Sequence, residues 1–216
     1  MRAIASSSVD PIPLRAPALP LGERDLALIR DALAAQPPRT VDVPERRKAA
    51  VLIMLFERDG EPWVVLTKRT ETVGAHKGEI SFPGGAHDVT DADMYATAVR
   101  ETQEELGVHP DGLTLLGALD DYPTFSSGFI VSPYIAAVEP PEEWLPSEAE
   151  IAHVIELPLA RLAAEGRMDV WERDGVRFPM HIFDVDGNYV WGVTAFILRR
   201  FLDVVGPALG YPDTLS

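Results

Sequence analysis

The chain of 216 residues contains no cysteine, and this absence excludes several kinds of chemistry at once. Without cysteine there is no disulfide framework, no thiolate nucleophile and no zinc site built on sulfur ligands. The longest uninterrupted apolar run, residues 49–56, is far shorter than the roughly 20 residues that a membrane-spanning helix needs. The first residues also lack the apolar stretch of a secretory signal. We therefore expect a cytoplasmic protein with no membrane partner.

Basic residues are also scarce, because 19 lysines and arginines stand against 34 acidic residues and give a net charge of −15. Such an excess of acid repels phosphate backbones, so nucleic acid is not an expected partner. A polyanionic small molecule would need a local cation to bridge it to this protein. The length and the hydrophobic fraction of 46% suit one domain with an appendage.

Residues 1–45 are predicted to form an N-terminal arm whose two ends are extended by prolines. Between these ends, Leu26, Ile29 and Leu33 recur at helical spacing and form one apolar face. This face leaves two alternatives open. It can close over a substrate pocket, or it can pack at the interface of a homodimer.

Residues 46–206 are predicted as the main domain, and residues 207–216 as a C-terminal tail. Strands are expected at residues 49–56, 63–67, 113–119, 129–138, 151–157, 168–172 and 177–184, and helices at 92–106, 158–164 and 192–205. Thr90 or Asp91 can cap the first of these helices, and Gly107 ends it. The strands and helices do not alternate regularly, which predicts an α/β (α+β) fold with a mixed sheet covered by helices.

The helix expected at residues 92–106 carries three glutamates, Glu101, Glu104 and Glu105. They could form a solvated acidic face. However, Glu101 and Glu105 repel each other across one helical turn, and all three lie near the negative end of the helix dipole. Carboxylates in this arrangement suit a hard divalent cation such as Mg²⁺. Arg100 could hold one of the carboxylates in place.

A glycine-rich segment, residues 82–85, precedes this helix. Glycine lets the backbone approach a ligand closely and exposes N–H and C=O groups to it. On its own such a segment is usually a turn. Joined to an acidic helix by a short loop, it indicates a site for a metal ion and an anionic ligand.

Together these residues resemble the Nudix box, whose pattern is G-x5-E-x7-R-E-U-x-E-E-x-G-U, with U an aliphatic residue. Gly85, Asp91 and residues 100–108 match it with three departures. Asp91 stands where the first glutamate belongs, eight residues instead of seven precede Arg100, and Thr102 replaces the aliphatic residue. The resemblance implies an α/β/α sandwich with a mixed sheet between helices.

Further upstream, residues 66–70, Gly78 and residues 82–85 resemble the second signature of the coenzyme A pyrophosphatase branch, L-L-T-x-R-S-x3-R-x3-G-x3-F-P-G-G. Thr70 replaces the serine, and Gly74 stands where an arginine is expected. Later segments that resemble the same branch are residues 124–133, 150–159 and 190–195.

The resemblance implies hydrolysis of a nucleoside diphosphate linked to another group, with Mg²⁺ or Mn²⁺ as cofactor. Glu101 and Glu105 are then the primary metal ligands, Glu104 is a further ligand or activates water, and the carbonyl of Gly85 is another ligand. Glu150 is a candidate general base, the alternative being a solvated loop residue. All four glutamates are thus predicted as catalytic residues.

Lys68, Arg69 and Lys77 are candidates for contacts to the substrate phosphates, the alternative being an ordinary charged strand end. Phe82 and Gly84 complete the predicted substrate-binding set. The leading hypothesis is cleavage of coenzyme A or a derivative to 4′-phosphopantetheine and 3′,5′-ADP. The alternatives are hydrolysis of another substrate, such as ADP-ribose, NADH or a nucleoside triphosphate, and a Nudix-fold module that binds a nucleotide without cutting it.

Overall fold

In a computed structural model of the chain, which describes residues 16–71, 77–124, 127–173 and 175–212, the central strand is β1 (Arg47–Arg58). Its alternate residues face opposite sides of the sheet, and both sides are buried, with Leu52 and Met54 in one cluster and Ile53 and Leu55 in the other. This explains why the strand reads as an almost continuous apolar run.

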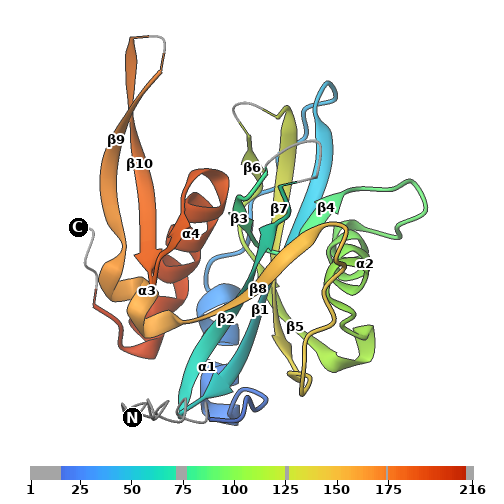
Figure 1. Cartoon of the computed structure of the whole chain (residues 1–216), viewed down its shortest axis with the longest axis vertical. Coiled ribbons are helices and arrows are strands. Elements are labelled where there is room, and N and C mark those ends of the chain that lie inside the picture. The colour runs from blue at the N-terminus through green and yellow to red at the C-terminus, as the bar shows by residue number, and fades with distance from the viewer. Residues whose placement is uncertain (1–15, 72–76, 125–126, 174, 213–216) are drawn as a thin grey trace, which may run out of the picture.

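Helices cover both faces of the sheet in which β1 is the central strand (Figure 1). On one face lies α2 (Met94–Leu106), which packs against β1, β4 and β7. The other face is covered by α1 (Glu23–Ala34), α3 (Leu159–Glu165) and α4 (Gly192–Leu209), whose apolar residues share the second cluster. This arrangement confirms the predicted mixed sheet between helices.

The sheet mixes parallel and antiparallel pairs. β1 pairs antiparallel with β2 (Glu61–Arg69) across the turn at Asp59 and Gly60, and parallel with β7 (Phe129–Val138). The strand order is β3-β2-β1-β7-β5, with β4 on β1, β6 on β7 and β8 on β2. The remaining bounds are β3 (Ile80–Ser81), β4 (Gly84–Ala86), β5 (Leu113–Ala118), β6 (Tyr122–Pro123), β8 (Ile151–Pro158) and a 3₁₀ turn at Pro110–Gly112.

A separate three-stranded sheet lies beside α4, in the order β11-β10-β9 (Figure 1). Its strands are β9 (Arg167–Arg173), β10 (Val176–Val185) and β11 (Asn188–Val190). α4 itself is longer than predicted, because it continues through Pro207 to Leu209 instead of ending at Val205. Within the described residues, no helix combines the length and apolar character that crossing a membrane requires.

The arm helix α1 packs against its own chain. Ile29 and Leu33 are buried among residues of α4 and β5, and Leu33 lies against the backbone of Gly117 in β5. Asp120 and Asp121 accept hydrogen bonds from the backbone N–H groups of Arg39 and Val41, which fastens the segment between α1 and β1. The apolar face of α1 is therefore part of the core.

Candidate active site

The acidic helix α2 begins later than the sequence predicted. Asp93 is its N-cap, and its side chain accepts a hydrogen bond from the N–H of Ala96 at 2.8 Å. The prediction of Thr90 or Asp91 as N-cap was wrong, because the Asp91 carboxylate is engaged by Arg100 instead. The predicted end at Gly107 is confirmed by its left-handed φ of 70°.

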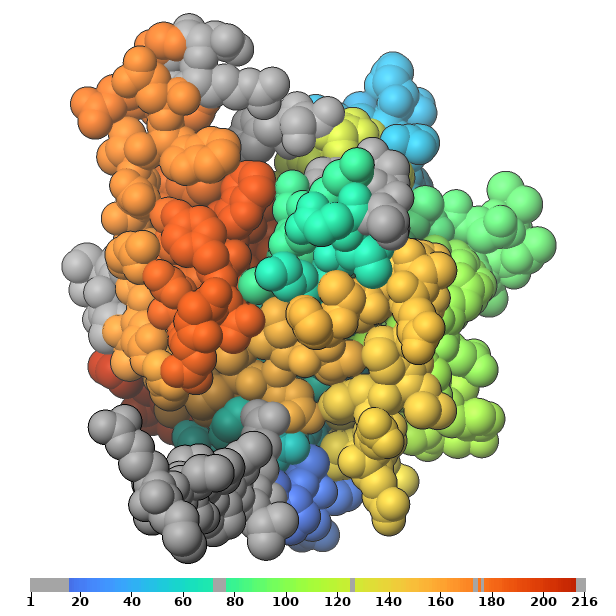
Figure 2. Space-filling view, in the orientation of Figure 1, coloured from blue at the N-terminus to red at the C-terminus, as the bar shows by residue number. Residues whose placement is uncertain are grey.

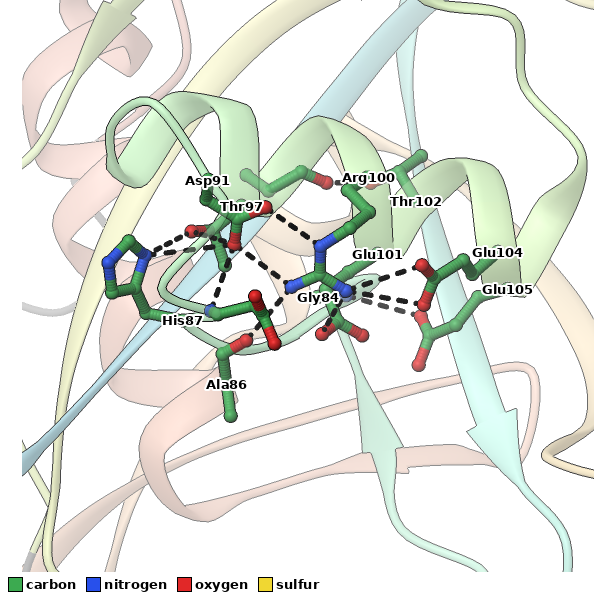
Figure 3. Close-up of polar contacts among 12 residues, drawn as sticks. Gly84, Ala86, His87, Asp91, Thr97, Arg100, Glu101, Thr102, Glu104 and Glu105 are labelled. Carbon is green, nitrogen blue, oxygen red and sulfur yellow. Dashed lines mark hydrogen bonds and ion pairs between the residues drawn. The ribbon is translucent and has the colours of Figure 1, made fainter.

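The Arg100 side chain lies across the surface of α2 and joins the helix to the preceding loop (Figure 3). Its Nε and Nη2 donate to the two oxygens of Asp91 at 2.9 and 3.0 Å, and Nη2 also donates to the carbonyl of Ala86. Nη1 donates to Glu101 at 2.9 Å and to Glu104 at 3.3 Å. The Arg100 guanidinium holds the pKa of Asp91 well below its usual range.

Glu105 is the most deeply buried of the three glutamates, with 4% of its surface exposed. Its Oε2 accepts a hydrogen bond from the N–H of Gly84 in β4 at 3.2 Å. Burial raises the pKa of Glu105 to about 7, although Gly84 and Arg69 act in the opposite direction. A carboxylate kept this far from water needs a cation to stay ionised at neutral pH.

Glu101 lies directly against the bare backbone of Gly85, where a Cβ would come within 2.4 Å of its carboxylate. Burial raises the pKa of Glu101, and Arg100 opposes this shift. Glu104 is different, because 59% of its side chain is exposed. The glycine-rich strand β4 therefore lies against the Glu101 and Glu105 side chains of helix α2.

The loop at residues 139–150 also borders this site, because it lies beside the C-terminal half of α2 (Figure 2). The N–H of Ser147 donates to the carbonyl of Glu105, and the N–H of Thr70 donates to the carbonyl of Glu150. Arg69 consequently lies between two carboxylates, with Nη1 at 3.6 Å from Glu105 and Nη2 at 3.8 Å from Glu150.

The pairing of β2 with β8 shifts register between Lys68 and Arg69, and such a bulge re-aims a side chain. The Nε atom of Arg69 is buried and has no hydrogen-bond partner within the described structure. A planar guanidinium with an unused donor suits an anionic ligand such as a phosphate, two of whose oxygens it can contact at once.

The donor set also fits a divalent cation of the Mg²⁺ type, because carboxylate and carbonyl oxygens are its preferred ligands. The contact between Glu101 and Gly85 leaves that carboxylate beside a backbone that only glycine allows. Among the described residues, no three acidic or histidine side chains already converge as a ligand set. Instead, Nη1 of Arg100 lies between Glu101 and Glu104 (Figure 3). The metal assignment therefore stays a prediction.

The other predicted substrate-binding residues fall in different places. Lys68 is half-buried within β2, and Lys77 is exposed in the turn before β3. The Phe82 side chain is 2% exposed and packs in the core, and its role in substrate binding stays a prediction. Gly84 offers its N–H to Glu105. Gly74, which stands where the second signature has an arginine, lies outside the described residues.

Two polar clusters were missed in the sequence. Thr97 is buried and donates to Asp91, and its position three residues before Arg100 places both on one side of α2. Trp144, in the acidic loop, donates through Nε1 to Glu156 at 2.8 Å and so anchors that loop. Glu156 also accepts a hydrogen bond from Nη1 of Arg58 in β1. This contact joins distant segments, and no local pattern predicts it.

Comparison with known proteins places this geometry in one family. The family model described as NUDIX domain matches residues 46–177. Two relatives called uncharacterized Nudix hydrolase NudL, from Salmonella paratyphi B and Salmonella typhimurium, are each 36% identical over 174 residues, which cover 79% of this chain and 89% of the relative. A crystal structure of a MutT/nudix family protein from Enterococcus faecalis matches with a TM-score of 0.53 at 15% identity, over 80% of this chain and 67% of that one. This last likeness shows the fold alone.

Proposed function

The chain belongs to the Nudix family and is a hydrolase of pyrophosphate bonds, and we propose that its substrate is coenzyme A or one of its derivatives. The proposed products are 4′-phosphopantetheine and 3′,5′-ADP. The observation that carries the proposal is the position of Arg69, an element of the coenzyme A pyrophosphatase signature, between Glu105 and Glu150. This position puts a phosphate-binding cation beside the carboxylates of the Nudix box.

The two ends of that signature also lie together. Thr67 of β2 pairs with Ser81 of β3, and the N–H of Arg69 donates to the carbonyl of Glu79. The segment after β3 continues into Gly84 and Gly85, which face Glu105 and Glu101. Residues that are distant in the signature thus line one site, which supports their joint use in binding one substrate.

A divalent cation, Mg²⁺ or Mn²⁺, would be held by Glu101, Glu104, Glu105 and the carbonyl of Gly85. When bound, it would neutralise the diphosphate and stabilise the charge that develops on the phosphoryl oxygens. Without such a cation, the ligand carboxylates would repel a diphosphate.

The remaining chemistry falls to this chain's own side chains. In the proposed reaction a water oxygen bonds to one phosphorus, and the bond from that phosphorus to the bridging oxygen breaks. The proton of the water passes to a carboxylate, for which Glu150 and Glu104 are the candidates because both are exposed to solvent. Arg69 binds a non-bridging phosphate oxygen and orients the diphosphate.

The test is a product assay by mass spectrometry with purified protein and Mg²⁺. Coenzyme A, ADP-ribose, NADH and a nucleoside triphosphate are supplied separately. We expect 4′-phosphopantetheine and 3′,5′-ADP from coenzyme A, and their loss in Glu105→Gln. Hydrolysis of another substrate alone would overturn the coenzyme A assignment, whereas no turnover with retained ligand binding would indicate a binding module.

The identity of the proton acceptor is tested in the same assay. We expect Glu150→Gln to lower kcat by roughly 100-fold if Glu150 is the general base. Glu148→Gln is the matched control, because Glu148 is an exposed glutamate of the same loop. An unchanged kcat in Glu150→Gln would move the role to Glu104.

A further inference from the structure

Helix α2 contains two fully buried threonines whose hydroxyl groups serve different partners. Thr102 donates to the carbonyl of Ala98 at 2.7 Å, a bond within the helix. Thr97 instead lies 2.8 Å from Oδ2 of Asp91 and 2.9 Å from Nδ1 of His87, both in the preceding loop (Figure 3). Thr97 therefore connects the helix to the preceding loop, whose residue Asp91 also binds the Arg100 guanidinium.

The direction of these hydrogen bonds follows from their chemistry. The Asp91 carboxylate accepts from Nε and Nη2 of Arg100, which keeps it ionised, so it can only accept from Thr97 as well. A hydroxyl has one proton, and although the Thr97 hydroxyl also lies 3.3 Å from the carbonyl of Asp93, the shorter, charge-assisted bond to Asp91 takes this proton. Nδ1 of His87 must then be the donor to Thr97. In this series of hydrogen bonds, His87 donates to Thr97 and Thr97 donates to Asp91. Asp91 also accepts the hydrogen bonds of Arg100.

The far side of Arg100 points to the glutamates of the candidate metal site. Because the guanidinium is rigid and planar, fixing Nε and Nη2 on Asp91 also fixes the direction of Nη1. Nη1 donates to Glu101 at 2.9 Å, while Nη2 also donates to the carbonyl of Ala86. The orientation of the Glu101 carboxylate thus depends on a series of bonds that begins at His87, a position that the Nudix box pattern leaves unspecified.

We propose that Thr97 is a positioning residue that holds Asp91, sets the Arg100 guanidinium and thereby orients Glu101 for metal binding. Asp91 has a shorter side chain than the glutamate of the family pattern, and the hydroxyl of Thr97 adds to the hydrogen bonds that its carboxylate accepts from Arg100 and from the N–H of Asp88. The part that concerns the metal rests on the proposed function. The part that concerns the bond series holds for the metal-free protein as well.

The metal-free protein gives the first test, by nitrogen-15 NMR of the histidine and arginine side chains. We expect His87 to carry its proton on Nδ1, and the Nε–H of Arg100 to exchange slowly with water. Thr97→Val should change the His87 tautomer signal and speed the Arg100 exchange, while Thr97→Ser restores both. Thr102→Val is the matched control, since it removes an equally buried hydroxyl from outside the series.

A neutral His87 that carries its proton on Nε2 and none on Nδ1 in the wild type would overturn the bond series, as would Arg100 exchange that is unaltered in Thr97→Val. If Thr97→Val does not fold, His87→Ala keeps the test open, because it removes the donor at the partly exposed end. It should speed the Arg100 exchange in the same direction.

Mn²⁺ titration followed by electron paramagnetic resonance gives the second test. Removal of a residue that orients a metal ligand typically weakens binding by roughly 10- to 100-fold. We expect the Kd for Mn²⁺ to rise by about 10-fold in Thr97→Val and to stay unchanged in Thr102→Val and Thr97→Ser. Equal Kd values in all variants would overturn the positioning role. A wild type that binds no Mn²⁺ would instead overturn the metal assignment, while the NMR result still judges the bond series.

Discussion

Glu105 and Gly84 are joined across the site by a hydrogen bond of 3.2 Å from the Gly84 N–H to Oε2, although they lie 21 residues apart in the chain. Gly84 reaches this position with a φ of +148°, a conformation that side-chain-bearing residues rarely adopt. The bond therefore couples the placement of a buried carboxylate to a backbone shape that requires glycine.

Replacement of Gly84 by alanine should consequently be costly. The added Cβ would lie 2.3 Å from the carbonyl oxygen of Ala50, a backbone atom of the central strand. We expect Gly84→Ala to lower the free energy of unfolding by roughly 2 kcal/mol more than Gly60→Ala. Gly60 also has a positive φ, but a Cβ added there would meet no other described residue within 4 Å. Equal losses in urea denaturation would contradict the role of this close approach.

The metal-free protein should lose stability as the pH rises toward neutrality, because of Glu105. Its pKa is about 7 in the folded chain and near its ordinary 4.5 in the unfolded chain. The folded state thus binds the proton more tightly, and its advantage disappears as the pH rises from about 4.5 to about 7. The difference amounts to about 3 kcal/mol.

Glu105→Gln should remove this dependence, so that above pH 7 the metal-free variant is more stable than the wild type. Exposed Glu104→Gln is the control and should follow the wild-type curve. Mg²⁺ at pH 8 should stabilise the wild type but not Glu105→Gln. Parallel curves of unfolding free energy against pH for wild type and Glu105→Gln would show that Glu105 stays ionised when buried.

Arg69 should matter for substrate binding more than for stability. We expect Arg69→Gln to lower kcat/KM by roughly 10- to 100-fold, the value of one to two hydrogen bonds to a charged group. Most of this loss should appear in KM if Arg69 binds substrate and transition state equally. Lys48→Gln is the control, since Lys48 pairs with Asp42 on the surface at 3.3 Å. Steady-state kinetics with unchanged KM would exclude a phosphate contact.

The ion pair between Arg58 and Glu156 should be the most sensitive polar contact outside the site. The two side chains are 7% and 10% exposed and meet at 2.7 Å. Arg58→Met leaves the Glu156 carboxylate buried without this cation, which should cost about 3 to 5 kcal/mol. The double variant with Glu156→Gln should be less destabilised than the sum of the two single changes. Arg161→Met, in an exposed pair with Glu165, should cost less than about 1 kcal/mol.

The sequence predicted best what depends on local pattern. The burial of β1 follows from its almost continuous apolar run, and the turn at Gly60 and the helix end at Gly107 follow from the conformational freedom of glycine. The helix start was misplaced because Asp91 and Asp93 are equally good caps by composition. Asp93 is available to cap the helix because Arg100 engages the carboxylate of Asp91, and this contact is visible only in the structure.

What the sequence could not predict depends on contacts between distant segments. The place of Arg69 between Glu105 and Glu150 results from pairing of β2 with β8 and from a register shift that has no pattern of its own. Phe82 was assigned to the substrate because it adjoins the glycines, yet its side chain turns into the core. An aromatic residue beside a functional loop is recognised as core only when the facing helices are known.

The parallel pairing of β1 with β7 also bears on how the chain acquires its structure. Residue 47 pairs with residue 129, so the parallel partner of the central strand lies far along the chain. Its antiparallel neighbour β2 follows directly in the sequence. Contacts of such long sequence separation slow folding. During synthesis the apolar β1–β2 hairpin emerges first and stays uncovered on its β7 edge. The strand that gives the mature enzyme its centre is thus the segment that most needs protection from aggregation before β7 is made.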